Sequence, residues 1–172
     1  MSSELLIRVN DWHNRANKEK EDYFVKFIFD YLAFVALICH RNYGNKSDRQ
    51  LIQELKRNNE HIRENYYSKA NHHRINEIVE ILKSDPITND TNPNDKWWDC
   101  VLDNCPNQVS PNDGIIESVD DFQNILEYIY RARNNLFHGR KGMNLRRDSL
   151  IVEYGFYLLN PLVEVLIDSK GN

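Results

Sequence analysis

The strongest helical pattern in this chain reads VDDFQNILEYIYRARNNLFHG, residues 119–139. Its apolar residues recur at helical spacing: Phe122, Ile125, Ile129, Ala132 and Leu136. Acidic residues lie at its start and arginines near its end, which is the arrangement that a helix dipole favours. Gly139 is a natural C-terminal stop. The pattern therefore predicts a helix over about 119–138.

The same periodicity recurs on both sides of this stretch. It predicts helices over 4–17, 21–41, 72–83 and 147–168. It also predicts a helix that Ser47 and Asp48 would cap, followed by a ragged helical continuation over 58–67. Pro161 lies inside the last of these and could kink it. No stretch of useful length alternates between apolar and polar residues as a β-strand would, so we expect an all-α helical bundle of about five to six helices.

Length and composition fit one globular domain over residues 1–172. Hydrophobic residues make up 41% and charged residues 28%, with only 6 glycines and 5 prolines. The stretch 84–114 differs, because it holds four of the prolines, many Asn and Asp residues, and Trp97-Trp98. It predicts a long irregular loop or insertion, over a site or over the core.

Three cysteines, Cys39, Cys100 and Cys105, give no paired disulfide framework. The first residues lack a basic region followed by an apolar run, and the longest apolar stretch, Tyr31 to Cys39, is short for a bilayer span. We therefore expect a cytoplasmic protein with no membrane partner.

Positive charge is concentrated in residues 131–147, although the whole chain has a formal net charge of −4. This segment contains no Asp or Glu and six basic residues: Arg131, Arg133, Arg140, Lys141, Arg146 and Arg147. Such a cluster can hold phosphates. We expect five of them to bind RNA: Arg131, Arg140, Lys141, Arg146 and Arg147.

The remaining arginine of the cluster, Arg133, lies near His138. His138 can move a proton near neutral pH, and Arg133 can stabilise charge that develops on phosphorus. These two roles suffice for attack of a ribose 2′-OH on its own phosphate. No carboxylate in the segment could hold a metal, so we expect neither a metal nor another cofactor.

Helix geometry limits how these side chains meet. Arg133 and His138 are five positions apart and diverge by about 140° on an ideal helix. Asn134 is four before His138, on its face, and could hydrogen-bond the imidazole. We expect a twofold homodimer that pairs this helix with its mate and brings two Arg and two His together.

Arg133-Asn134-x-x-x-His138, followed by Gly139 after an amphipathic helix, resembles the RNxxxH signature of HEPN domains. The resemblance implies a small helical bundle and a metal-independent endoribonuclease of toxin–antitoxin or phage-defence type. Arg133 and His138 would then be catalytic and Asn134 supporting. It also implies an antitoxin or nucleotidyltransferase partner, but the tyrosine that some toxin members carry after the His is missing here.

Other interpretations remain open. Arg133 and His138 could cap a helix end, in a non-catalytic module that dimerises or binds nucleotide or RNA. A structural dimer without affinity for nucleic acid is a third possibility. The histidines His61, His72 and His73 are expected to be exposed polar residues, and Cys100-x4-Cys105 ordinary loop thiols.

Overall fold

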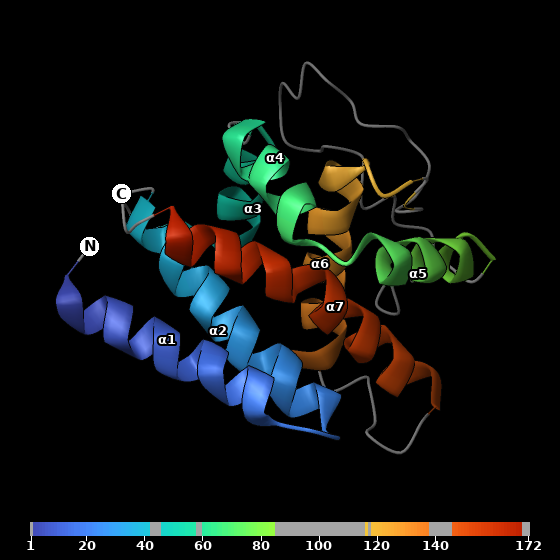
Figure 1. The fold of residues 1–172 in the computed structure, drawn as a ribbon, viewed down its shortest axis with the longest axis horizontal. Helices are drawn as coiled ribbons and strands as arrows, with labels where there is room; N and C mark the ends of the chain where they lie inside the picture. The colour runs from blue at the N-terminus through green and yellow to red at the C-terminus, as the bar shows by residue number, and fades with distance from the viewer. Residues whose placement is uncertain are drawn as a thin grey trace.

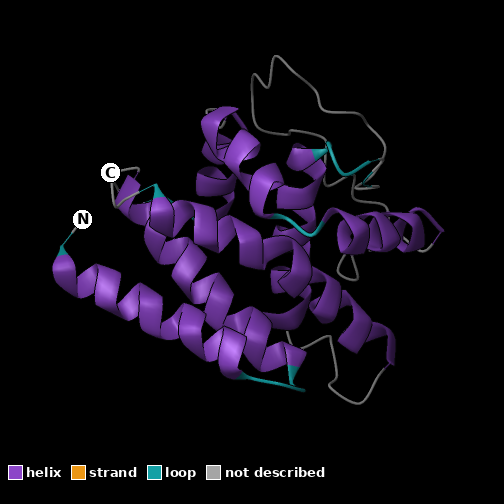
Figure 2. Ribbon diagram, in the orientation of Figure 1, coloured by secondary structure: helices purple, strands orange, loops and turns teal. Residues whose placement is uncertain are grey.

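The computed structural model describes residues 2–41, 46–57, 60–84, 116, 118–137 and 146–169. These residues form seven α-helices: α1 (Ser3–Lys18), α2 (Tyr23–Arg41), α3 (Asp48–Arg57), α4 (Glu60–Lys69), α5 (His72–Ser84), α6 (Phe122–Phe137) and α7 (Arg146–Asp168). Within the described ranges no strand occurs, as Figure 2 shows. The expected all-α helical bundle is confirmed, although the described residues form seven helices where about five to six were expected. The expected loop over 84–114 lies outside the described residues, apart from Ser84, which ends α5.

The long apolar helices α2 and α7 form the centre of the bundle (Figure 1). Helix α1 packs along α2, and α2 packs along α7. Helices α4, α5 and α6 contact α7, while α3 contacts both α2 and α6. Helix α3 therefore lies where it can present side chains to α6, the helix with the RNxxxH pattern.

Polar side chains define where several helices begin. The Oγ of Ser47 accepts a hydrogen bond from the Gln50 backbone N–H at 3.3 Å, and Gln50 Oε1 accepts from the Ser47 N–H at 2.9 Å. This reciprocal pair is a capping box and confirms the expected cap of the third helix. Asp121 likewise accepts from the Asn124 N–H at 3.3 Å. Because Asp121 is the cap, α6 begins at Phe122, three residues later than the sequence predicted.

A glycine allows the two central helices to come close. A Cβ atom added at Gly155 of α7 would lie 2.9 Å from the Phe27 ring of α2 and 3.4 Å from the Ala132 Cβ of α6. The first distance is shorter than carbon atoms tolerate. Gly155 therefore lets Phe27, which is fully buried, fill the junction of three helices.

The segments Tyr23–His40 and Asp148–Asp168 are each long and apolar enough to cross a membrane, judged by length and composition alone. Core helices of soluble proteins have the same properties. Here the two segments pack against each other in the bundle. The expected absence of a membrane partner stays a prediction.

Candidate functional site

Arg133 lies on the last turns of α6 and contacts the first residue of α3. Its Nη2 atom is 3.1 Å from Asp48 Oδ2, and the two side chains are 28% and 27% exposed. Its Nη1 atom donates to Asn134 Oδ1 at 2.8 Å. The guanidinium carbon also lies 5.7 Å from the ring centre of Tyr31 on α2. Three helices thus hold one partly exposed arginine in a defined orientation.

Tyr31 completes this group of side chains, which we call the Arg133 cluster: Tyr31, Asp48, Arg133 and Asn134. The Tyr31 hydroxyl donates to Asp48 Oδ2 at 3.2 Å. Burial, and then the charge of Asp48, raise the pKa of Tyr31 above its ordinary value. Tyr31 therefore stays protonated as a donor, and Asp48 accepts hydrogen bonds from both Tyr31 and Arg133.

A second ion-pair group joins the same two helices. Glu127 of α6 is fully buried, and its Oε1 accepts from Arg49 Nη1 at 2.6 Å. Its Oε2 accepts from the Lys56 ammonium. The Arg49 guanidinium also lies 5.2 Å from the ring centre of Tyr130. Two cations of α3 thus hold one buried carboxylate of α6, which fixes α3 against the helix that carries Arg133.

The structure places the expected site residues in different surroundings. Arg133 and Asn134 are partly exposed, and Arg146 is exposed at the start of α7. Arg131 is only 2% exposed. The other expected residues lie outside the described part of the chain, or have side chains outside it: His138, Arg140, Lys141 and Arg147.

One expectation needs correction, and two further contacts add to the others. Arg131 lies among buried residues, so it is not on a surface that RNA could reach in the single chain. The basic segment has no acid of its own, but the fold brings Asp48 to Arg133. The side-chain oxygen of Asn134 accepts from Arg133, and its expected hydrogen bond to His138 stays a prediction because His138 lies outside the described residues. The burial of Arg131 and the contact between Asp48 and Arg133 reduce the positive charge available to a phosphate.

A buried polar network lies on another side of α2, and the sequence analysis did not identify it. His13 Nδ1 of α1 is 2.8 Å from Asp30 Oδ1, and Asp30 is fully buried. Asn160 of α7 donates to Asp30 Oδ2 at 2.8 Å and to Asn17 Oδ1 at 3.0 Å. Asp30 is an acid within the most apolar helix, and that was the available signal. The network joins α1, α2 and α7.

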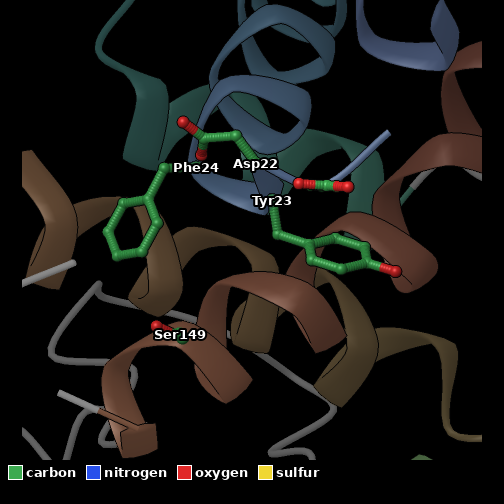
Figure 3. A pocket seen from close by; sticks show the side chains of 5 residues that line it. Asp22, Tyr23, Phe24 and Ser149 are labelled. Carbon is green, nitrogen blue, oxygen red and sulfur yellow. The ribbon is translucent and has the colours of Figure 1, made fainter. Parts of the chain in front are cut away.

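A shallow hollow of about 280 Å³ lies where α2 and α7 begin (Figure 3). Its lining residues are Glu21, Asp22, Tyr23, Phe24 and Ser149. Asp22 Oδ1 already accepts from the Val25 N–H at 3.1 Å, as a helix cap. The lining carries two acids and no cation, so this hollow does not suit a phosphate ligand, and it shares no residue with the Arg133 cluster.

The three histidines considered as metal ligands, His61, His72 and His73, are exposed as expected. Among the described residues no group of three His, Cys, Asp or Glu side chains has the proximity that a metal ion requires. Cys100 and Cys105 lie outside those residues.

Neither a protein-family model nor a curated protein nor a solved structure matches this chain.

Proposed function

We propose that this chain is a metal-independent endoribonuclease of the HEPN type, in which Arg133 and His138 act on RNA. The observation that carries the proposal is the placement of Arg133 at the end of α6, partly exposed and oriented by Asn134 and Asp48. His138 follows five residues later, directly before Gly139. An oriented arginine and a histidine five residues further along the chain provide the groups that cleavage of a phosphodiester needs.

The proposed reaction is an internal transfer at phosphorus. The ribose 2′-oxygen attacks the adjacent phosphate, the 5′-oxygen of the next nucleotide leaves, and a 2′,3′-cyclic phosphate forms. His138 takes the proton from the 2′-OH or gives one to the leaving oxygen. Arg133 binds the phosphate and stabilises the charge that develops on its oxygens.

Asp48 and Asn134 support this role as positioning residues. The Asp48 carboxylate and the Asn134 amide oxygen contact different nitrogens of the guanidinium, which restricts its rotation. Less orientational freedom is then lost when RNA binds. The cost is that the negative charge of Asp48 opposes the phosphate, so other cations have to attract RNA. We assign that role to Arg140, Lys141, Arg146 and Arg147.

The proposal extends to partners and location. We assign RNA as the substrate, a homodimer as the active form, and a cytoplasmic toxin or defence role with an antitoxin as the restraint. Control by a nucleotidyltransferase would need another target residue, because Arg140 and Lys141 follow Gly139 where some toxins carry a tyrosine.

The test is cleavage of structured and single-stranded RNA in EDTA by the parent, His138→Ala, Arg133→Ala and Arg8→Ala proteins. Arg8 is an exposed arginine of α1 and serves as the matched control. We expect each site substitution to slow cleavage by about 100-fold or more, whereas Arg8→Ala leaves it unchanged. The products should carry 5′-OH and cyclic-phosphate ends. Cleavage that survives both site substitutions contradicts the proposal.

One observation favours a second candidate, a non-catalytic module that binds RNA or nucleotide. Arg133 already has an anionic partner, as expected of an arginine that stabilises a helix end. RNA binding that persists in His138→Ala, with no cleavage by the folded parent, would support this candidate.

A further inference from the structure

One face of the central helix α2 is partly exposed and carries no charged side chain. Several of its residues also pack against the edge of the core. Leu32 is the most exposed residue on this face, at 39%. Its neighbours on the face are partly exposed. We call the set the α2 stripe: Val25, Ile28, Phe29, Leu32, Val35, Ala36 and Cys39. An uninterrupted apolar face of this kind on a soluble bundle is typical of an interaction surface.

The spacing of the α2 stripe is that of a helix that packs on another helix. Val25, Leu32 and Cys39 are seven residues apart, and Ile28 and Val35 fall between them in the alternation of three and four. This alternation is the a and d pattern of a two-helix seam. The stripe spans about 21 Å of helix at 1.5 Å per residue, which is two heptads.

The pattern is also symmetric. Relative to Leu32, the other six residues lie at offsets of three, four and seven in both directions along the helix. A second α2 running antiparallel across a twofold axis at Leu32 would therefore place an apolar side chain opposite every member of the stripe. Self-complementarity of this kind is what a twofold interface between identical chains requires.

We infer that a second copy of this chain docks on the α2 stripe through its own α2, in antiparallel orientation. The sequence analysis expected the motif helix to pair with its mate instead. In the fold, α6 packs between α3 and α7, and its residues from Phe122 to Ile129 are nearly all buried. Helix α2 presents the longer continuous apolar surface.

The borders of the stripe favour a protein partner over a lipid surface. At one edge, the Arg15 guanidinium of α1 lies 5.4 Å from the Phe29 ring centre. At the other edge lies the Arg133 cluster, in which the Asp48 carboxylate neighbours Cys39 and helps to raise its pKa, after burial. A helix that lies on an anionic membrane is bordered by cations. Here one border carries a carboxylate paired with an arginine.

The symmetry places the two Arg133 clusters on one side of the dimer. In an antiparallel pair the twofold axis is perpendicular to the plane of both helices, so elements that flank the stripe on one side remain on that side in both copies. Tyr31 precedes Leu32 by one residue and contacts Asp48. Both clusters would thus lie near the axis, and RNA could contact both. This last consequence rests on the proposed function, whereas the docking does not.

Sedimentation and light scattering test the docking directly. We expect the parent to be a dimer in exchange with monomer, and Leu32→Glu to raise the dimer dissociation constant by about 100-fold or more. The matched control is Ile81→Glu, because Ile81 of α5 is exposed to a similar degree, 42%, away from the stripe. Circular dichroism checks that each variant is folded. A parent that stays monomeric, or a Leu32→Glu protein that dimerises as the parent does, overturns the inference.

Cysteine crosslinking tests the orientation. With Cys39, Cys100 and Cys105 changed to Ser, Leu32→Cys should give a disulfide-linked dimer under mild oxidation, and Ile81→Cys should not. Val25→Cys should crosslink when Cys39 is retained and should fail when Cys39 is Ser. A Val25→Cys crosslink that forms even when Cys39 is Ser indicates a parallel pair and contradicts the antiparallel arrangement.

A vesicle experiment distinguishes docking of a second copy from binding to a membrane. Vesicles of phosphatidylcholine and phosphatidylserine are mixed with the parent and with Leu32→Glu. A monomeric parent that floats with the vesicles only when Leu32 is intact would assign the stripe to a membrane and overturn the inference. RNA cleavage is measured separately. A dimer without cleavage contradicts the proposed reaction and leaves the docking intact. Cleavage by a monomer contradicts the docking and the homodimeric active form, and leaves the proposed reaction intact.

Discussion

The guanidinium of Arg133 lies between a carboxylate and an amide oxygen, at 3.1 Å from Asp48 and 2.8 Å from Asn134. Each contact restricts the orientation of the guanidinium, but only the carboxylate competes with an incoming phosphate for binding to it. Asp48 also accepts a hydrogen bond from Tyr31. The orientation of Arg133 and its electrostatic strength therefore depend on one acidic residue, which a single substitution can test.

The substitution Asp48→Asn removes the charge and keeps a side-chain oxygen for Tyr31. We expect the free energy of unfolding to fall by about 0.5–1 kcal/mol, since the ion pair is partly exposed. The affinity for RNA should rise a few-fold as the local field becomes more positive. Urea unfolding and fluorescence anisotropy measure the two effects. The control is Glu54→Gln, on the same helix as Asp48, which removes the partly exposed ion-pair partner of Lys46. Unchanged RNA binding contradicts this account of Asp48.

A second prediction at this scale concerns alkaline pH. The hydroxyls of Tyr23 and Tyr157 are 2.7 Å apart, and burial, followed by this hydrogen bond, raises the pKa of Tyr23 to about 12. The folded state favours the protonated phenol. Its contribution is therefore complete below the ordinary tyrosine pKa of about 10 and is lost as the pH rises through about 12.

Tyr23→Phe should thus lower stability at neutral pH and flatten its decline between these two values. Urea unfolding across the alkaline range measures this, with tyrosinate absorbance to follow the ionisation. An alkaline decline as steep as that of the parent would show that other groups cause it.

Among the helices, α3 does most to assemble the site, because it supplies the partners of two α6 residues. Asp48 contacts Arg133, while Arg49 and Lys56 contact Glu127. Glu127 is fully buried, and its two cations are only 21% and 15% exposed. Charges this far from water need their partners, so the α3–α6 junction depends on Glu127.

Glu127→Gln should therefore destabilise the protein strongly, because it removes the buried negative charge that both cations contact. We expect the free energy of unfolding to fall by about 2–3 kcal/mol. This is toward the lower end of the range for a broken buried ion pair, because both cations can still reach water. Glu80→Gln is the matched control: Glu80 pairs with Lys83 on the surface of α5, and its loss should cost at most about 0.5 kcal/mol. Urea unfolding measures both. Equal effects would indicate that the buried cluster contributes no more than a surface pair.

The helices themselves could be predicted from the sequence, because periodicity and caps are local properties. The capping box at Ser47 and the acidic start of α6 are visible within four residues. The ion pairs could not be predicted in this way, because Asp48 and Arg133 are far apart along the chain. Summing charges over residues 131–147 gave a purely basic cluster, since a local sum cannot include a carboxylate from another helix. The burial of Arg131 depends on tertiary packing for the same reason.

Viewed as a whole, the molecule is arranged around α2 and its neighbour α7 (Figure 1). The side chains of α2 fall into three groups. Asp30 joins the buried network with His13 of α1 and Asn160 of α7. Tyr31 contacts the Arg133 cluster of α3 and α6. The α2 stripe is partly exposed. The first two groups join α2 to α1, α3, α6 and α7 through polar contacts, and the third offers an uncharged surface to a second copy.

If α2 joins two copies, the thermal stability of the protein has to depend on its concentration. Unfolding then separates two chains, and mass action favours the folded dimer as the concentration rises. For two chains of this length, Tm should rise by about 2 °C for each tenfold increase in concentration. The Leu32→Glu variant should have a constant Tm, whereas Ile81→Glu, with its change on α5, should behave as the parent does. A parent Tm that is constant over a wide concentration range would mean that α2 is exposed in the working protein, and the Arg133 cluster would then have to act within one chain.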